Sequence, residues 1–138
     1  SSMKELCPKR IIAVFGCGGD RDKNKRPKMG RSVAKYSDFC YITSDNPRTE
    51  NPESIIDMIE TGVNEVSSNY IRITDRKSAI ITALENAREG DLLLIAGKGH
   101  EDYQILGKEK IHFDDTEIVK EYLRLPQRHK GTEVNFLI

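Results

Sequence analysis

Neither sign of charge is in excess in this sequence, because 22 Lys and Arg residues balance 22 Asp and Glu residues. A nucleic-acid partner is therefore not expected, since domains that bind nucleic acid carry an excess of positive charge. No run approaches the ~20 apolar residues of a membrane span, and a signal peptide is not expected. We expect a cytoplasmic protein with no membrane partner.

Cysteine is scarce, with three residues at positions 7, 17 and 40. The number is odd and the spacing is not that of zinc ligands, so neither a disulfide framework nor a metal site is expected. The chain also lacks internal repeats and low-complexity tracts. What remains is typical of one soluble globular domain, since 138 residues with 37% hydrophobic composition can bury a core.

Short apolar runs alternate with amphipathic stretches along the chain. The runs predict strands at 11–15, 39–43, 70–74 and 92–96, and the stretches between them predict helices from Pro27, from Pro52 and from Arg76. A last helix follows Asp114 or Asp115 and ends near residue 123. Residues 103–106 and 108–113 flank Gly107 like a hairpin of polar edge strands.

This alternation predicts an α/β, Rossmann-like fold: a mostly parallel sheet with helices on both faces and a C-terminal edge hairpin. We expect residues 10–124 to form the domain, residues 1–9 to be a tag scar and leader, and residues 125–138 to be a tail without periodicity. In the strand order 3-2-1-4, the loops after strands one, two and four meet at one edge. These three loops carry the unusual chemistry.

The first loop, 16–27, is rich in glycine and in positive charge. Gly16, Gly18 and Gly19 allow the backbone to turn sharply and to bring amide groups close to a ligand. The following helix adds the positive end of its dipole, and four cations lie nearby: Arg21, Lys23, Lys25 and Arg26. An anion is the expected ligand, although a tight turn with solvated charges explains these residues equally well.

The second loop contains Asp45, Asn46, Pro47 and Arg48, and a further proline stiffens its end. Asn46 offers an amide donor and acceptor, and Arg48 offers a planar guanidinium that suits a carboxylate. From spacing alone, the slightly favoured alternative is an Asn-Pro turn with Arg48 in water.

The third loop is Gly97, Lys98, Gly99, His100, Glu101 and Asp102, directly after the most apolar strand. Gly97 can present its backbone to a ligand, and Glu101 can receive an ammonium group. A single loop histidine such as His100 is more often structural than catalytic, and the acidic pair also fits a solvated surface. With two arginines for carboxylates and Asn46 for polar recognition, the loops suit a zwitterionic amino acid. No catalytic residue is expected.

In their order and spacing, the three loops resemble the carboxyl-terminal domain of the Mur ligases. The resemblance rests on Gly-Gly-Asp-Arg-Asp-Lys-x-Lys-Arg-Pro at 18–27, Asp-Asn-Pro-Arg at 45–48 and Ala-Gly-Lys-Gly-His-Glu at 96–101. It extends over about residues 10–123. Within that family, the sequence is most similar to the ligases that add meso-diaminopimelate to UDP-N-acetylmuramoyl-L-alanyl-D-glutamate.

The resemblance implies a bacterial domain that binds the incoming amino acid and closes over ATP, which a central ATPase domain holds with Mg²⁺. In that family an acyl phosphate forms on the dipeptide, and the amino group attacks it. The matching positions imply that meso-diaminopimelate contacts Arg21, Asn46, Arg48, Gly97 and Glu101. Their motif neighbours support these loops (Asp45, Pro47, Lys98, Gly99 and His100), and three cations approach the ATP phosphates (Lys23, Lys25 and Arg26).

Lysine-adding relatives replace the arginine of the Asp-Asn-Pro-Arg motif, so Arg48 favours diaminopimelate. The phosphate loop and magnesium ligands of the family are absent from this sequence. We therefore expect an excised domain of a longer ligase, inactive alone and without a cofactor of its own. Two alternatives stay open: a related amide ligase of the folylpolyglutamate or cyanophycin type, and a stand-alone module that binds an amino acid or anion.

Overall fold

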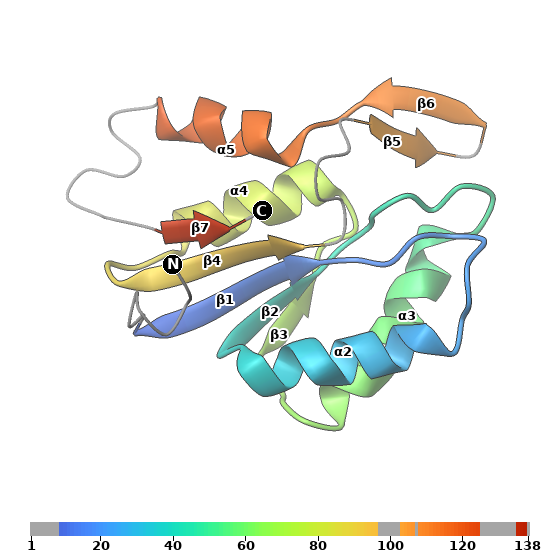
Figure 1. The fold of residues 1–138 in the computed structure, drawn as a ribbon, viewed down its shortest axis with the longest axis horizontal. Coiled ribbons are helices and arrows are strands. Elements are labelled where there is room, and N and C mark those ends of the chain that lie inside the picture. Colours follow the sequence, from blue (N-terminus) through green and yellow to red (C-terminus); the bar gives the residue numbers. More distant parts are fainter. Residues whose placement is uncertain (1–8, 97–102, 107, 125–134, 138) are drawn as a thin grey trace.

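A parallel sheet forms the centre of the computed structural model, which describes residues 9–96, 103–106, 108–124 and 135–137 (Figure 1). Its strands are β1 (Arg10–Phe15), β2 (Phe39–Ile42), β3 (Tyr70–Arg72), β4 (Asp91–Ala96) and β7 (Asn135–Leu137). They lie in the order β3-β2-β1-β4-β7, and every neighbouring pair is parallel. The predicted order of the first four strands is confirmed.

Helices cover both faces of this sheet. Helices α2 (Lys25–Tyr36) and α3 (Pro52–Asn64) pack together on one face, and α4 (Arg76–Glu85) and α5 (Asp115–Leu123) pack together on the other. Strand β1 shows why its sequence is apolar throughout. Ile12 and Val14 belong to the core on the α4 and α5 side, whereas Ala13 and Phe15 belong to the core on the α2 and α3 side. A strand buried on both faces has no polar alternation.

Side-chain caps define where three of the helices begin. Asn51, Asp75 and Asp114 each accept a hydrogen bond from a backbone N–H in the first turn of α3, α4 and α5. Helix α2 begins at Lys25, two residues before the expected Pro27. Proline is tolerated throughout a first turn because those N–H groups have no partner within the helix.

The last third of the chain differs from the expectation. The predicted hairpin forms as β5 (Tyr103–Leu106) and β6 (Glu109–His112), but these strands make a two-stranded sheet of their own. The neighbour of β4 is instead β7, within the segment expected to be a tail. Strand β7 has three residues, too few to show a periodicity in the sequence.

Candidate functional site

The loops that follow β1 and β2 lie side by side at the carboxyl edge of the sheet (Figure 1). The Gly19 N–H donates a hydrogen bond to the Asn46 carbonyl at 2.6 Å. A Cβ on Gly19 would lie 1.8 Å from the Pro47 carbonyl oxygen, so a larger residue would force the loops apart. Residues 16–24 and 43–51 thus form one surface, which we call the two-loop platform.

Arg48 is bound to the first loop. Its Nη1 donates to the carbonyl of Gly19 at 3.0 Å and to that of Asn46 at 3.4 Å, and the side chain is half-buried. The alternative of an Arg48 in water is therefore wrong. Among the described residues the guanidinium hydrogen-bonds through Nη1 to these two carbonyls.

Arg21 and Arg48 flank the same glycine. A Cβ on Gly18 would lie 3.0 Å from Arg48 Nη1 and 3.5 Å from Arg21 Cγ. The absence of a side chain at Gly18 leaves space that both arginine side chains adjoin. The structure thus brings together the two cations expected to bind carboxylates, although Arg21 itself is exposed.

Backbone strain marks the platform as well. Asp20 and Arg48 have φ values of 55° and 52°, which are uncommon for residues other than glycine. The Asp20 carboxylate accepts a hydrogen bond from the Thr49 hydroxyl at 2.9 Å, which ties the two strained turns together. Strain of this kind persists where surrounding contacts hold it, and it clusters at ligand sites.

Arg26, in the first turn of α2, stabilises the platform by contacts with both of its loops. Its guanidinium makes a bidentate pair with Glu50, with both N···O distances at 2.7 Å, and donates to the Gly18 carbonyl at 3.0 Å. The pair with Arg26, followed by a hydrogen bond from the Asp20 amide, lowers the pKa of Glu50 to about 2. Arg26 was expected to approach the ATP phosphates. Its side chain is instead 1% exposed and directed to partners within the protein. A loop cation with a carboxylate partner in the next loop cannot be distinguished from a solvated one by sequence.

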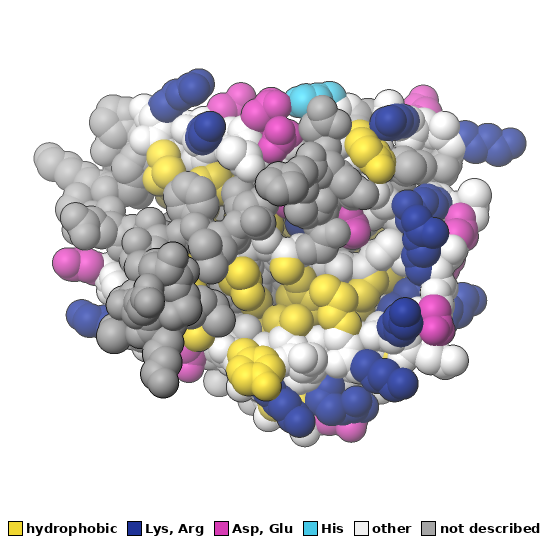
Figure 2. Space-filling view, viewed as in Figure 1, with side chains coloured by type: hydrophobic (Ala, Val, Ile, Leu, Met, Phe, Trp, Pro, Cys, Tyr) yellow, Lys and Arg dark blue, Asp and Glu magenta, His cyan; other side chains and the backbone are white. Residues whose placement is uncertain are grey.

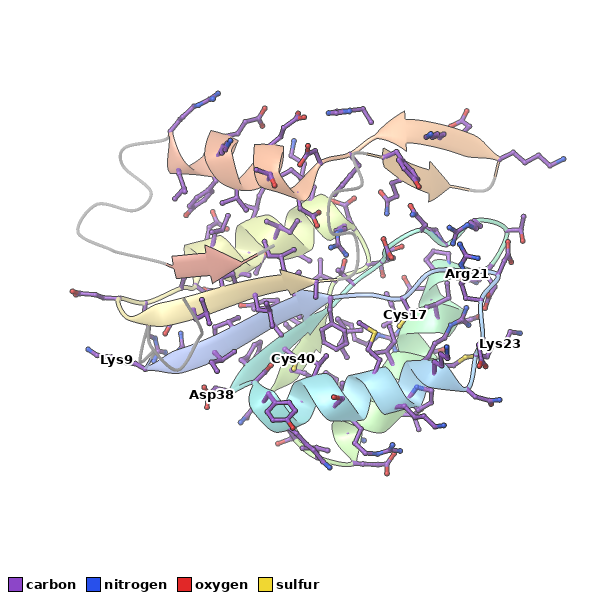
Figure 3. All side chains as sticks on the ribbon, in the orientation of Figure 1. Lys9, Cys17, Arg21, Lys23, Asp38 and Cys40 are labelled. Carbon is purple, nitrogen blue, oxygen red and sulfur yellow. The ribbon has the colours of Figure 1, made fainter. Side chains whose placement is uncertain are left out.

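Lys23 and Lys25 remain exposed beside Arg21. Figure 3 shows Arg21 and Lys23 at the outer end of the first loop, and Figure 2 shows Lys and Arg side chains gathered on that side of the molecule. Arg21 and Lys25 line a cavity of about 440 Å³ with Cys17 and Met29. Burial raises the pKa of the Cys17 thiol to about 11, so this cysteine is protonated and is not a nucleophile at neutral pH.

The remaining motif residues of the second loop are buried. Asp45, Asn46 and Pro47 are all largely covered, and the Asp45 carbonyl accepts a hydrogen bond from Gln104 Nε2 at 2.7 Å. The second loop is thus held by strand β5 as well as by the first loop. The expected residues of the third loop lie outside the described residues (Gly97, Lys98, Gly99, His100 and Glu101).

A buried ion pair that the sequence did not reveal lies next to the platform. Arg76, at the start of α4, makes a bidentate pair with Asp115 at 2.9 and 2.8 Å. Arg76 is 0% and Asp115 2% exposed. The sequence contains only a weak indication of this pair. A cation in the first turn of a helix interacts unfavourably with the helix dipole, so an acidic partner for Arg76 could be expected.

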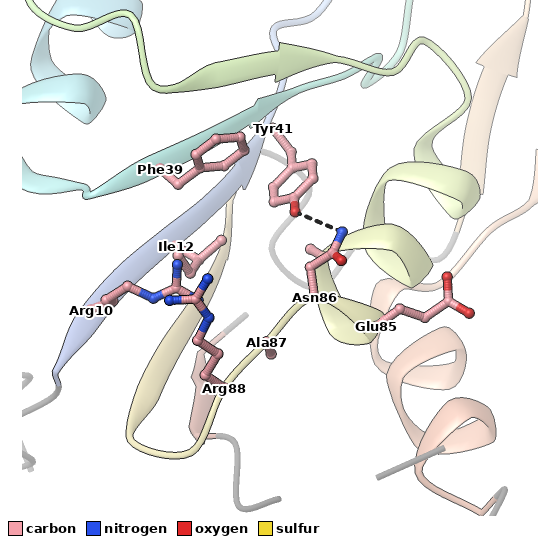
Figure 4. A pocket seen from close by; sticks show the side chains of 9 residues that line it. Arg10, Ile12, Phe39, Tyr41, Glu85, Asn86, Ala87 and Arg88 are labelled. Atoms are coloured by element: carbon pink, nitrogen blue, oxygen red, sulfur yellow. Dashed lines mark hydrogen bonds between the residues drawn. The ribbon is translucent and has the colours of Figure 1, made fainter. Parts of the chain in front are cut away.

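A second cavity, of about 510 Å³, lies at the opposite end of β1 and β2 (Figure 4). There Arg10 makes a bidentate pair with the buried Asp91, and Asn86 Nδ2 lies 3.5 Å from the Tyr41 hydroxyl. None of the expected site residues lines this cavity, so we do not include it in the candidate site.

Within the described ranges, no group of three or more His, Cys, Asp or Glu side chains is arranged to hold a metal ion. The part of the chain that the structure describes also contains no helix long and apolar enough to cross a membrane. What the platform offers is therefore cationic and amide groups without a metal centre. These groups can bind and orient an anionic or zwitterionic ligand.

Comparison with known proteins shows the family of the chain. The glutamate ligase domain of the Mur ligases matches residues 1–99. The chain belongs to the Mur ligase family. This Mur ligase domain is 58% identical over 120 residues to UDP-N-acetylmuramoyl-L-alanyl-D-glutamate--2,6-diaminopimelate ligase 2 of Clostridium acetobutylicum, covering 87% of the chain and 25% of that protein. It is 59% identical over 114 residues to the ligase of Gloeobacter violaceus that is named for the same substrates. That match covers 83% of this chain and 23% of the Gloeobacter protein.

A solved structure carries the same name, UDP-N-acetylmuramoyl-L-alanyl-D-glutamate--2,6-diaminopimelate ligase. It matches the Mur ligase domain with a TM-score of 0.81 and 40% identity, over 86% of this chain and 24% of that one. The likeness confirms the expected Rossmann-like fold class. The chain spans about a quarter of the length of the relatives it matches.

Proposed function

We propose that this chain is the carboxyl-terminal domain of an ATP-dependent amide ligase of peptidoglycan biosynthesis. The longer ligase adds meso-diaminopimelate to UDP-N-acetylmuramoyl-L-alanyl-D-glutamate in the bacterial cytoplasm, and this domain binds the amino acid. The names and identities of the relatives support the proposal. The observation that carries it is the joining of the Asp-Asn-Pro-Arg loop to the glycine-rich loop through Arg48 and Gly19.

The residues expected to contact diaminopimelate have roles that follow from their chemistry. The half-buried Arg48 pairs with the carboxylate at the far end of diaminopimelate, because its planar guanidinium offers two parallel donors. Arg21 approaches a second carboxylate from the exposed side of Gly18, and Asn46 contributes polar recognition. From the third loop, Gly97 contributes backbone contacts and Glu101 holds an ammonium group.

The chemical step needs groups from outside this domain. ATP and Mg²⁺ are held mainly by the central ATPase domain of the longer ligase, where the dipeptide carboxylate is converted to an acyl phosphate. We infer that this domain places the amino group for attack on that acyl phosphate, and that Lys23 and Lys25, which are exposed, approach the ATP phosphates. Arg26 is excluded from that role because it is paired with Glu50.

A substrate assay with the longer ligase tests the proposal. The enzyme is supplied with ATP, the nucleotide dipeptide and either meso-diaminopimelate, lysine or glutamate, and the product is identified by mass. We expect product with diaminopimelate and little or none with lysine, which lacks the second carboxylate. Equal use of lysine, or use of glutamate alone, would contradict the proposal and favour a related amide ligase.

A further inference from the structure

Two successive carbonyl groups at the root of the second loop are each held by a buried side chain from a distant element. The Ser44 carbonyl accepts from Arg76 Nη1 at 3.2 Å, and the Asp45 carbonyl accepts from Gln104 Nε2 at 2.7 Å. Arg76 comes from α4 and Gln104 from β5, and they are 0% and 6% exposed. Both contacts lie directly before Asn46 and Arg48, whose positions they constrain.

The same guanidinium also reaches the end of strand β4. Arg76 Nη2 donates to the carbonyl of Ala96 at 3.1 Å, and Ala96 is the last residue of β4 before the third loop. One rigid group therefore joins the root of the second loop to the carboxyl end of β4. Asp115, at the start of α5, holds the guanidinium in this orientation through a bidentate pair at 2.9 and 2.8 Å.

Stability alone does not account for this ion pair. Apolar residues of similar volume replace buried ion pairs without loss of stability in many proteins, because burying two charges is costly. What apolar residues cannot supply is a planar group with donors in fixed directions. Arg76 uses those donors on the Ser44 and Ala96 carbonyls, which belong to different parts of the chain, so its contribution is the position of the second loop against the end of β4.

We propose that Arg76, oriented by Asp115 and assisted by Gln104, is a positioning residue that sets the second loop relative to the carboxyl end of β4. It touches no substrate. It acts through the backbone that carries Asn46 and Arg48, and it tunes the affinity for the amino acid that the platform binds. The identity of that amino acid rests on the proposed function, whereas the positioning of the loop does not.

The first test measures the loop without any ligand. In the double variant Arg76→Met with Asp115→Leu, both charges are removed and apolar side chains take their place. We expect backbone amide exchange at residues 45–50 to rise about tenfold or more, as expected when hydrogen bonds that hold a loop are lost. The matched control is Arg10→Met with Asp91→Leu, a bidentate pair at the opposite end of the sheet, which should leave exchange in this loop unchanged.

The second test uses the longer ligase. The Arg76 and Asp115 double variant should raise the KM for diaminopimelate about tenfold, the equivalent of one lost hydrogen bond, while the KM for ATP stays within about twofold. A merely structural role would lower the activity with every substrate alike. Unchanged exchange in a folded double variant overturns the proposal, and so does raised exchange with an unchanged KM for diaminopimelate.

Two further variants keep the test decisive if the double variant does not fold. Arg76→Lys keeps the charge but not the planar donors, and Gln104→Met removes one contact to the Asp45 carbonyl. Each should raise amide exchange at residues 45–50, and wild-type exchange in both would overturn the proposal. If the wild-type ligase incorporates no diaminopimelate, the proposed function fails, while the exchange result still decides the role of Arg76.

Discussion

The guanidinium of Arg26 meets the carboxylate of Glu50 in a bidentate pair, with both N···O distances at 2.7 Å. The first residue comes from the start of α2 and the second from the end of the second loop. Because the same guanidinium also donates to the Gly18 carbonyl, the pair fastens the two loops of the platform to each other. The two loops are thus fixed to each other by contacts within the protein, which reduces the cost of ordering them when a ligand binds.

Removing Arg26 should destabilise the domain strongly. Arg26→Met leaves the Glu50 carboxylate without its partner, and we expect a loss of about 3 kcal/mol in the free energy of unfolding, the lower end for a broken buried pair. The control is Arg31→Met, which breaks the exposed pair of Arg31 with Glu65 and should cost about 1 kcal/mol or less. Urea denaturation of this chain measures both, and equal losses would contradict the structural role of Arg26.

The Glu50 pair should also make stability depend on pH. The pKa of Glu50 is lowered to about 2 in the folded chain, below the unfolded value of about 4.3. Its contribution is therefore complete above about pH 5 and is lost as the pH falls toward about 2. The difference in unfolding free energy between wild type and Glu50→Gln should shrink over this window. A difference that stays constant from about pH 6 to pH 3 would contradict this assignment.

Two neighbouring glycines should respond differently to alanine. In Gly19→Ala the new Cβ would meet the Pro47 carbonyl at 1.8 Å, so the loops must separate, at a cost on the order of 2 kcal/mol or more. In Gly18→Ala the nearest atom is Arg48 Nη1 at 3.0 Å, the end of a flexible side chain. We therefore expect Gly18→Ala to retain most of the thermal stability but to weaken use of diaminopimelate. Equal melting temperatures for the two variants would show that the loops are not in close contact.

Arg48 should determine the choice between diaminopimelate and lysine. Without the second carboxylate, lysine leaves the guanidinium partly desolvated and unpaired. In the longer ligase, Arg48→Ala should therefore lower kcat/KM for diaminopimelate sharply, by on the order of 10²-fold, and that for lysine little. Arg48→Lys should not restore it, because an ammonium cannot reproduce the two parallel donors. If both amino acids lose activity equally, Arg48 holds only the loop through the Gly19 carbonyl.

This chain alone should turn over no ATP. Its sequence has no Gly-Lys-Ser or Gly-Lys-Thr phosphate loop, and the described residues hold no metal-binding group. A phosphate-release assay on the 138-residue chain should match the buffer control, and turnover should appear when the central domain is present. Hydrolysis by the chain alone would contradict the assignment of ATP binding to another domain.

Prediction from sequence succeeded where a local pattern is sufficient. The run from Ile11 to Phe15 is apolar throughout because both faces of β1 are buried, and Asp75 and Asp114 mark helix starts by side chains that accept backbone N–H groups. It was less successful for β7, since three residues in a strand show no periodicity. The pairing of β7 with β4 depends on a segment distant in the chain.

For the candidate site, sequence indicated the loops but not the direction of their side chains. The order of the strands follows from alternation and handedness, and so does the meeting of the first two loops at one edge. Whether a loop cation points to solvent or to a carboxylate depends on its neighbours in space. Thus Arg26 pairs with Glu50 and Arg48 binds the Gly19 carbonyl, although both residues resemble solvated charges in sequence.

The sequence by itself determined the fold class, the family and the motifs that meet at the carboxyl edge, because these depend on short-range periodicity and on residue types at fixed spacing. Only the tertiary structure decided which polar groups are buried together. Arg76, Asp115 and Gln104 come from three separate elements, and no local pattern links them. A buried charge is stable only when it is paired with an opposite charge or a hydrogen-bonding group. Which group lies next to it depends on how the elements pack and not on the order of residues in the chain.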